Sequence, residues 1–184
     1  MVAVFTTIGH SNRPLEVFTA MLREAQVRLV VDVRAFPRSR TNPAYNIETL
    51  PAELAALQIG YAHIRALGGR KIRQREVQES VNAFWRERSF HNYADYALGD
   101  EFAEGLNELV VLGSTQRVAI MCSEAVWWRC HRRIITDYLL LSGHPVTHLL
   151  NPGHRDEARA TPGARRTDDG KVIYPAEDDT RAVS

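Results

Sequence analysis

The chain has 184 residues, 45% of them hydrophobic, which is enough to bury the core of one domain without disulfides or structural metal. Its formal net charge of +1 gives no general attraction to nucleic acid or to acidic membranes. No apolar run is long enough to span a bilayer, and the N-terminal residues lack a signal-peptide pattern. Two cysteines without such a signal favour reduced thiols, so we expect a cytoplasmic protein that does not bind membranes.

The first half of the chain alternates between strand and helix patterns. A strand is expected over residues 2–8, followed by a turn and a helix that begins near Pro14 and reaches Ala25. Residues 28–34 form an apolar, β-branched run with almost no alternation, as in a strand covered on both faces. A loop rich in Pro, Arg, Ser and Asn follows, and then a helix over 50–57 and a strand over 60–64.

The second half continues the same alternation. After a turn at residues 67–70 we expect a short helix over 91–96 and an amphipathic helix over 100–112 that Gly113 ends. The apolar run that ends at Cys122 predicts a buried strand. A helix that reaches Leu141 and a strand over 146–150 complete the pattern.

This alternation predicts a single α/β domain over residues 1–150, with three layers and a mostly parallel sheet flanked by helices, of Rossmann-like or flavodoxin-like type. Residues 151–184 are dominated by charges of both signs and are expected to form an extended or partly disordered tail. Ligands of such folds bind at the carboxyl ends of the strands. His10, Asp32, Arg34, His63 and Cys122 all lie at these ends.

Motifs at the same strand ends resemble a known family. They are Thr7-Ile8-Gly9-His10-Ser11, Val31-Asp32-Val33-Arg34 with Pro37 and Ser39-Arg40, Tyr61 with His63, Leu67-Gly68-Gly69-Arg70, Tyr93-Ala94-Asp95-Tyr96, and Met121-Cys122-Ser123-Glu124 with Cys130-His131-Arg132. Together they resemble the bacterial and archaeal family catalogued as domain of unknown function 488. The resemblance implies a site built from these positions and indicates no substrate.

Cys122 has three alternative roles. A thiol between a strand and a helix N-terminus, with arginines and a histidine nearby, is placed to form a reactive thiolate. It is also a residue type that is often simply buried. As a third alternative, Cys122, Glu124, Cys130 and His131 are possible metal ligands. Cys130 and His131 would point about 100° apart on a helix, so no metal is assigned.

Carboxylates and arginines complete the predicted site. Glu124 and Asp32 are candidates for general acid–base catalysis, with salt bridges to arginine as the alternative, and Asp32 should share a face with Arg34. The basic loop Arg38-Ser39-Arg40-Thr41-Asn42, together with Arg70, is suited to anion contacts, and a solvated loop is the alternative. Phe36, Tyr45 and Tyr61 are candidates for stacking on a base.

We therefore expect an enzyme that acts on an anionic small molecule or nucleic-acid fragment, with Cys122 and Glu124 at its chemical centre. The alternatives are a non-catalytic nucleotide or nucleic-acid binder and a metal-dependent hydrolase. No dinucleotide fingerprint or phosphate-binding loop occurs, and no cofactor is expected. The expected catalytic residues are Cys122, Glu124, Asp32, His10 and His63. The expected substrate-binding residues are Arg34, Ser39, Arg40, Gly68, Gly69, Arg70, Tyr93, Asp95, Cys130, His131 and Arg132.

Overall fold

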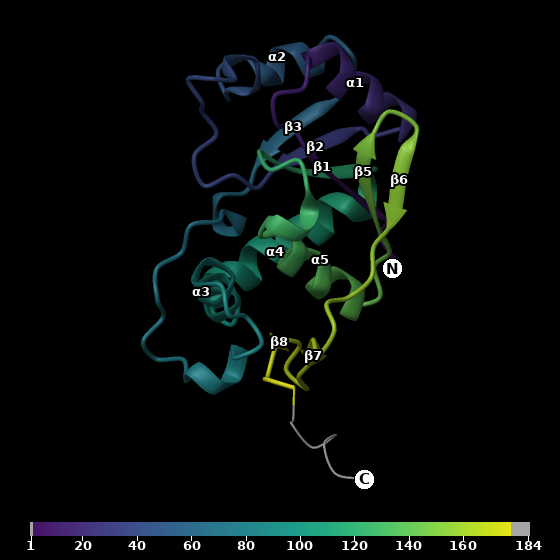
Figure 1. Cartoon of the computed structure of the whole chain (residues 1–184). Helices are drawn as coiled ribbons and strands as arrows, with labels where there is room; N and C mark the ends of the chain where they lie inside the picture. The colour runs from purple at the N-terminus through teal and green to yellow at the C-terminus, as the bar shows by residue number, and fades with distance from the viewer. Residues whose placement is uncertain (1, 178–184) are drawn as a thin grey trace.

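Apolar segments of the chain form a central sheet in the computed structural model, which describes residues 2–177 (Figure 1). Its parallel strands are β1 (Phe5–Gly9), β2 (Leu29–Asp32), β3 (Gly60–His63), β4 (Val118–Cys122) and β5 (Val146–Asn151). The antiparallel strand β6 (His154–Glu157) pairs with β5. Within the described residues the strand order is β3-β2-β4-β1-β5-β6, which differs from the usual Rossmann and flavodoxin orders.

Helices cover both faces of the sheet and complete three layers (Figure 1). On one face α1 (Leu15–Glu24) and α2 (Leu50–Ala55) bury their apolar side chains against β2 and β4. The opposite face packs against α4 (Asp100–Thr115) and α5 (Arg132–Leu141), with α3 (Arg88–Tyr96) beyond them. The predicted three-layer α/β fold with a mostly parallel sheet is confirmed.

Short 3₁₀ helices occupy several connections. They are η1 (Pro43–Tyr45), η2 (Arg65–Leu67), η3 (Glu79–Asn82) and η4 (Trp127–Arg129). The helix η4 lies between β4 and α5, so a loop and a 3₁₀ turn, rather than a direct strand-to-helix step, follow Cys122.

The segment after residue 150 is more ordered than the expected tail. Residue 150 lies inside β5, and β6 extends the sheet beyond it. A hairpin of β7 (Arg165–Arg166) and β8 (Val172–Ile173) follows. Tyr174 is fully buried and its hydroxyl donates to the Asp137 carboxylate at 2.8 Å, so the segment packs on the domain at least to that residue. Residues 178–184 of the expected tail lie outside the described residues.

Gly113 does not end a helix as predicted, because α4 continues through it to Thr115. A Cβ at Gly113 would lie 2.4 Å from the ring of Phe5, so the glycine provides room for this side chain of β1. Close packing of α4 on the sheet therefore requires a glycine at this position.

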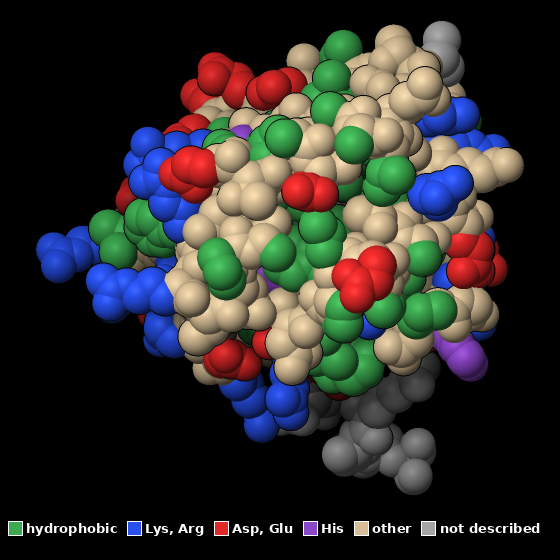
Figure 2. All heavy atoms as spheres, turned by 90° about the horizontal axis from the view of Figure 1, so that it is seen from above, with side chains coloured by type: hydrophobic (Ala, Val, Ile, Leu, Met, Phe, Trp, Pro, Cys, Tyr) green, Lys and Arg blue, Asp and Glu red, His purple; other side chains and the backbone are tan. Residues whose placement is uncertain are grey.

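The surface carries charges of both signs. Acidic and basic side chains are interspersed over the α1–α2 side of the molecule, and basic ones project along one edge of this view (Figure 2, left). Among the helices of the described residues, none combines the length and the apolar character needed to cross a membrane.

Candidate functional site

The carboxyl ends of β1, β2 and β4 meet at a cavity of about 510 Å³. Alternation along these strands sends side chains to both sides of the sheet, so the cavity receives groups from two layers. Arg34 and His10 reach it on the α1–α2 side, and Cys122 reaches it on the α4–α5 side. A volume of this size suits a small-molecule ligand.

Asp32 and Arg34 form a buried bidentate ion pair, as the alternation of β2 predicts. Arg34 Nε donates to Asp32 Oδ1 at 2.9 Å, and its Nη2 donates to Oδ2 at 2.7 Å. The Tyr61 hydroxyl also donates to Asp32 Oδ2, at 2.5 Å. Asp32 is completely buried and does not line the cavity. Its oxygens are used in holding Arg34, so its position fits a structural role better than the predicted catalytic one.

His10 is held as a neutral imidazole between its neighbours. Its Nδ1 donates to the carbonyl oxygen of Ser11 at 2.8 Å, which leaves Nε2 to accept from Arg34 Nη1 at 3.2 Å. Burial and the charge of Arg34 lower the pKa of His10 to about 4, against the contribution of the Ser11 hydrogen bond. Its ring stacks on Tyr45 at 4.4 Å. Both ring nitrogens of His10 are therefore engaged in hydrogen bonds, so neither is free to carry a proton to a substrate in the role predicted from the sequence.

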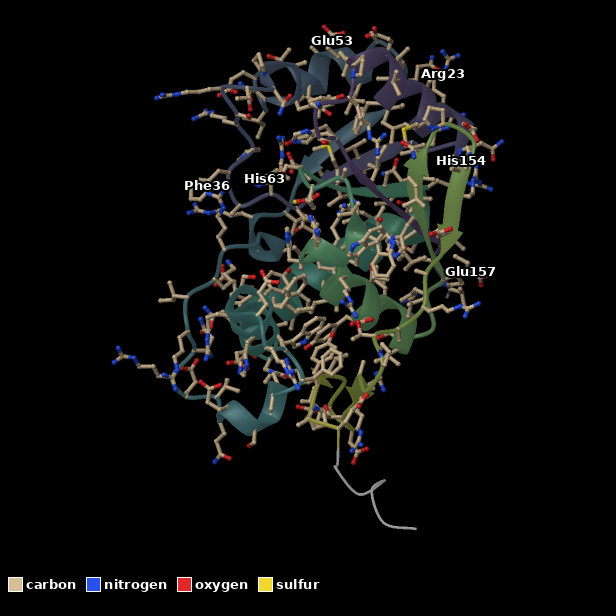
Figure 3. All side chains as sticks on the ribbon, viewed as in Figure 1. Arg23, Phe36, Glu53, His63, His154 and Glu157 are labelled. Carbon is tan, nitrogen blue, oxygen red and sulfur yellow. The ribbon has the colours of Figure 1, made fainter. Side chains whose placement is uncertain are left out.

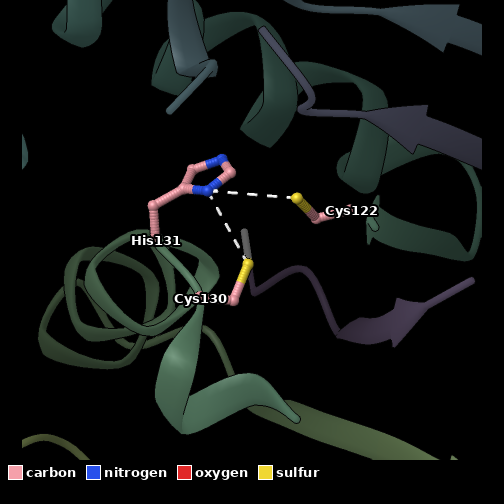
Figure 4. A group of neighbouring side chains, drawn as sticks. All are labelled: Cys122, Cys130 and His131. Carbon is pink, nitrogen blue, oxygen red and sulfur yellow. Dashed lines mark hydrogen bonds between the residues drawn. The ribbon is translucent and has the colours of Figure 1, made fainter. Parts of the chain in front are cut away.

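Two thiols and an imidazole converge on the opposite wall of the cavity (Figure 4). His131 Nδ1 lies 3.6 Å from the Cys130 sulfur and 4.0 Å from the Cys122 sulfur. The other ring nitrogen, Nε2, donates to the carbonyl oxygen of Val33 at 2.8 Å. Since a carbonyl only accepts, Nε2 carries a proton, and Nδ1 is the ring nitrogen that faces the two sulfurs.

The two thiols are held in different states. A hydrogen bond to Cys130 and burial raise the pKa of the Cys122 thiol well above its usual range. Burial also opposes ionisation of Cys130, but the hydrogen bond from Cys122 and the charge of Arg132 outweigh it and hold the pKa of Cys130 well below its usual range. The two thiols interact closely, so their ionisation belongs to the pair, and their surroundings favour Cys130 as the more acidic of the two.

Cys130 and His131 do not diverge on a helix as expected. Cys130 has extended backbone angles (φ −119°, ψ 145°) between η4 and α5, and His131 is the N-cap residue of α5. Their side chains can therefore face the same point, which removes the geometric objection to a shared metal ion. Within the part of the chain that the structure describes, Cys122, Cys130 and His131 are the group whose ligand atoms all lie within 4.8 Å of one another.

The loop after β4 is fixed by close backbone packing. A Cβ at Gly9 would lie 1.9 Å from the carbonyl oxygen of Glu124, so only glycine allows β1 to pass this loop. Arg132 Nη2 donates to the same oxygen at 2.5 Å. The Glu124 carboxylate itself is exposed at the cavity, where its Oε1 accepts from the backbone N–H of Val126 at 3.4 Å.

The arginine-rich loop after β2 contributes unequally to the cavity. Ser39 lines it, and so does Arg38, which pairs with Glu48 on the surface. Arg40 is exposed and lies outside the cavity lining. Phe36 is 67% exposed and projects from this loop at the same edge of the molecule as His63 (Figure 3). Of the three aromatic residues expected to stack on a base, Phe36 alone remains available, because Tyr45 and Tyr61 hold His10 and Asp32.

The turn at residues 68–70 forms another part of the wall. Gly69 packs against the ring of His131, and a Cβ there would lie 2.9 Å from its Nδ1. Arg70 is exposed with φ of +59°, an uncommon backbone conformation for a residue other than glycine. Tyr93 faces His131 at a ring distance of 5.1 Å, and its hydroxyl donates to the Leu67 carbonyl oxygen.

Several predicted site residues lie outside the cavity lining: Asp32, His63, Arg40, Gly68, Asp95 and Arg132. His63 Nε2 bonds to the carbonyl oxygen of Arg34 at 2.8 Å, which places it behind that residue. Asp95 accepts from Asn82 Nδ2 at 2.7 Å in a separate buried cluster. Arg132 acts on the site from behind, through its contact with the Cys130 sulfur.

Sequence reasoning missed two residues that line the cavity, Ser89 and Phe90, and assigned no binding role to Arg129, which also lines it. Ser89 and Phe90 come from α3, which is distant in sequence from the motifs at the strand ends. The position of Arg129 in the loop between Cys122 and Cys130 is the signal in the sequence that could have identified it.

The fold and the site define an α/β protein with a polar cavity at the carboxyl edge of its sheet and a cysteine–histidine cluster in the cavity wall. The family model described as "Domain of unknown function DUF488" matches residues 14–139. The chain therefore belongs to this family, as its motifs indicate. Comparison with curated proteins and with solved structures gives no match.

Proposed function

We propose that this protein is an enzyme that acts on an anionic substrate bound in the cavity, with its chemical centre at Cys122, Cys130 and His131. One observation carries the proposal: the thiol–imidazole cluster and arginine side chains line the same cavity. Thiols and an imidazole supply nucleophilic, proton-transfer or metal-binding chemistry, and arginine supplies anion recognition. Glu124 is a further acid–base candidate beside this centre.

Arg70 and Arg129 are the proposed anion-binding residues. Both line the cavity, and no side-chain hydrogen bond or ion pair engages either of them within residues 2–177. Arg34 and Arg38, by contrast, already pair with Asp32 and Glu48. Guanidinium groups bind phosphate and carboxylate in a bidentate manner, so a substrate that carries one of these groups fits the cavity.

A nucleotide is the favoured substrate class. The exposed ring of Phe36 belongs to the cavity lining, where a base can stack on it while a phosphate contacts the arginines. The chemical centre lies at the wall formed by β4 and the start of α5.

Binding of AMP and of inorganic phosphate to the full chain, measured by isothermal titration calorimetry, tests the anion site. Arg70→Ala and Arg129→Ala should each weaken AMP binding by about tenfold, because a charge-assisted hydrogen bond contributes about 1.5–3 kcal/mol. Arg159→Ala is the matched control, since Arg159 is exposed and lies outside the cavity lining. Equal affinities in all three variants would contradict the proposal.

Catalysis is tested with the same variants and with substitutions at the chemical centre. Release of phosphate from AMP and of p-nitrophenol from phosphate mono- and diesters provides the assay. Cys122→Ser and Cys130→Ser should keep AMP binding and lose turnover. A non-catalytic binder, the alternative predicted from the sequence, instead requires indifference to both substitutions and a steep decrease of affinity with salt.

A further inference from the structure

The side chains of Cys122, Cys130 and His131 have the spacing of ligands around one small metal ion (Figure 4). A tetrahedral zinc ion with Zn–S of about 2.3 Å and Zn–N of about 2.0 Å separates sulfur and nitrogen ligands by about 3.6 Å. The observed separations from His131 Nδ1 are 3.6 Å to Cys130 and 4.0 Å to Cys122. These two separations lie within a few tenths of an ångström of that value, and all three ligand atoms lie within 4.8 Å of one another.

The hydrogen bonds around His131 fix the ring as a metal ligand requires. A metal-binding histidine typically donates its other ring N–H to a backbone carbonyl or a carboxylate, which sets the tautomer and the ring orientation. His131 makes this contact from Nε2 to the carbonyl oxygen of Val33, at 2.8 Å. Gly69 packs against the ring on its Nδ1 side and restricts where the ring can lie.

The Cys130 sulfur is also held in place by hydrogen bonds, as the His131 ring is. Arg132 directs its Nε and its backbone N–H at this sulfur, at 3.3 Å and 3.5 Å. N–H donors to a ligating thiolate are a common feature of the shell around metal sites. The hydrogen bonds that surround both residues are thus already in place.

Three ligands leave one position of a tetrahedron open. Cys122, Cys130 and His131 all line the cavity, whereas Glu124 and His10, which also line it, are not part of the group of mutually close ligand atoms. Because all three residues line the cavity, a ligand in the fourth position would reach the ion from the cavity. Three protein ligands and one open position are typical of catalytic zinc, whereas structural zinc has four protein ligands.

Ligand chemistry selects the ion. Thiolate and imidazole ligands favour zinc and other soft or borderline metals, and they exclude magnesium and calcium, which bind oxygen. Two thiolates also balance the charge of a divalent ion in this largely buried place.

From these observations we infer that Cys122, Cys130 and His131 form a zinc site whose fourth position opens into the cavity. This inference rests on the proposed function, because it places the ion at the chemical centre of the proposed enzyme. When bound, zinc would supply a Lewis acid and an activated water molecule beside the anionic substrate, which narrows the reaction class to hydrolysis. The chain's own residues would hold the ion, orient His131 and position the anion.

The test is the metal content of the full chain, purified under reducing conditions without chelators and measured by inductively coupled plasma mass spectrometry. The wild-type protein should contain about one zinc ion per chain, and Cys122→Ser, Cys130→Ser and His131→Gln should each lower the content by about tenfold or more. His154→Gln is the matched control because His154 is exposed on β6, away from the ligand group, and its ring bonds to the carbonyl oxygen of Pro152. It should retain the ion.

A second measurement requires no substitution. Cobalt(II) added to the metal-free wild-type protein should give thiolate-to-cobalt charge-transfer absorption and the strong visible bands of tetrahedral coordination, saturating at about one ion per chain. Circular dichroism checks that each variant is folded. Absence of both zinc and the cobalt bands would overturn the inference, and so would stoichiometric iron or copper in place of zinc.

Arg70→Ala separates this inference from the proposed function. It should retain zinc and lose AMP affinity, because Arg70 lines the cavity outside the ligand group. Zinc without AMP binding in the wild-type protein would contradict the proposed function alone. AMP binding without zinc would contradict the metal site alone.

Discussion

Arg132 lies with its Nε 3.3 Å from the sulfur of Cys130, and both side chains are buried. The same guanidinium donates to the carbonyl oxygen of Glu124. Arg132, at the start of α5, therefore bonds to residues near both ends of the loop after β4, Glu124 and Cys130. This arrangement makes Arg132 a positioning residue for the cysteine–histidine cluster, although it does not line the cavity.

Arg132→Lys is expected to weaken zinc binding by about 10- to 100-fold, the usual effect of losing a hydrogen bond to a metal ligand. Lysine keeps the charge but lacks the planar fork that reaches the Cys130 sulfur and the Glu124 carbonyl oxygen together. Competition with a chromogenic chelator measures the affinity. Arg133→Lys is the control, because Arg133 bonds to Thr161 instead, and equal affinities in the two variants would count against the role of Arg132.

Asp32→Asn should lower the free energy of unfolding by about 3 kcal/mol or more, because it leaves the buried guanidinium of Arg34 without its counter-charge. Glu124→Gln alters an exposed carboxylate and should change that free energy by no more than about 0.5 kcal/mol. Urea denaturation of both variants provides the comparison. An Asp32→Asn protein as stable as the wild type would show that the ion pair has no structural role.

Gly9→Ala should destabilise the fold by about 3 kcal/mol, at the upper end of overpacking costs. Its Cβ would meet backbone atoms, with the Glu124 carbonyl oxygen at 1.9 Å, so β1 or the cysteine loop must move. Gly60→Ala serves for comparison, because its nearest neighbour is a methyl group of Leu29 at 3.1 Å, which can shift. Thermal and urea unfolding measure both, and equal losses would refute the packing argument.

His148 should make the fold less stable in mild acid. Burial, followed by the charge of Arg132, lowers its pKa from 6.5 to about 4, so the folded protein holds the ring neutral. The unfolded chain takes up a proton as the pH falls below 6.5, and the folded state does so only near pH 4. The contribution of His148 to the free energy of unfolding is therefore fully present above pH 6.5. It decreases by about 3 kcal/mol as the pH falls from 6.5 to about 4.

Urea unfolding across this pH range measures the decline. His148→Gln should remove about half of it, because His10 has a similarly lowered pKa of about 4 and remains in the variant. His154→Gln, at an exposed position, should leave the pH dependence unchanged. Parallel curves for wild type and His148→Gln would exclude a contribution from His148.

Periodicity predicted the fold because its signals are local. The continuous apolar run before Cys122 and the β-branched run at residues 29–32 became the buried strands β4 and β2. The contact between Asp32 and Arg34 follows from the two-residue repeat of a strand. Gly113 was misread as a helix end because its partner, Phe5, lies far away in sequence.

The site was only partly predictable, because its chemistry depends on contacts between distant segments. Strand-end position identified Cys122, and its neighbours in sequence suggested Cys130 and His131. The sequence gives no indication that His131 donates from Nε2 to the carbonyl oxygen of Val33, or that Arg132 donates to the Cys130 sulfur. The extended backbone at Cys130, which lets both residues face one point, likewise depends on the 3₁₀ turn before it.

The central claim is that the arginines and the cysteine–histidine cluster serve one ligand in one cavity. Titration of the isotopically labelled wild-type protein with AMP, followed residue by residue by NMR, tests it most directly. We predict that the largest shifts occur at the backbone amides of Arg70, Ser123, Arg129 and His131, which surround the cavity. Shifts confined to the exposed basic residues Arg73 and Arg75, with none at Ser123 and His131, would contradict the account.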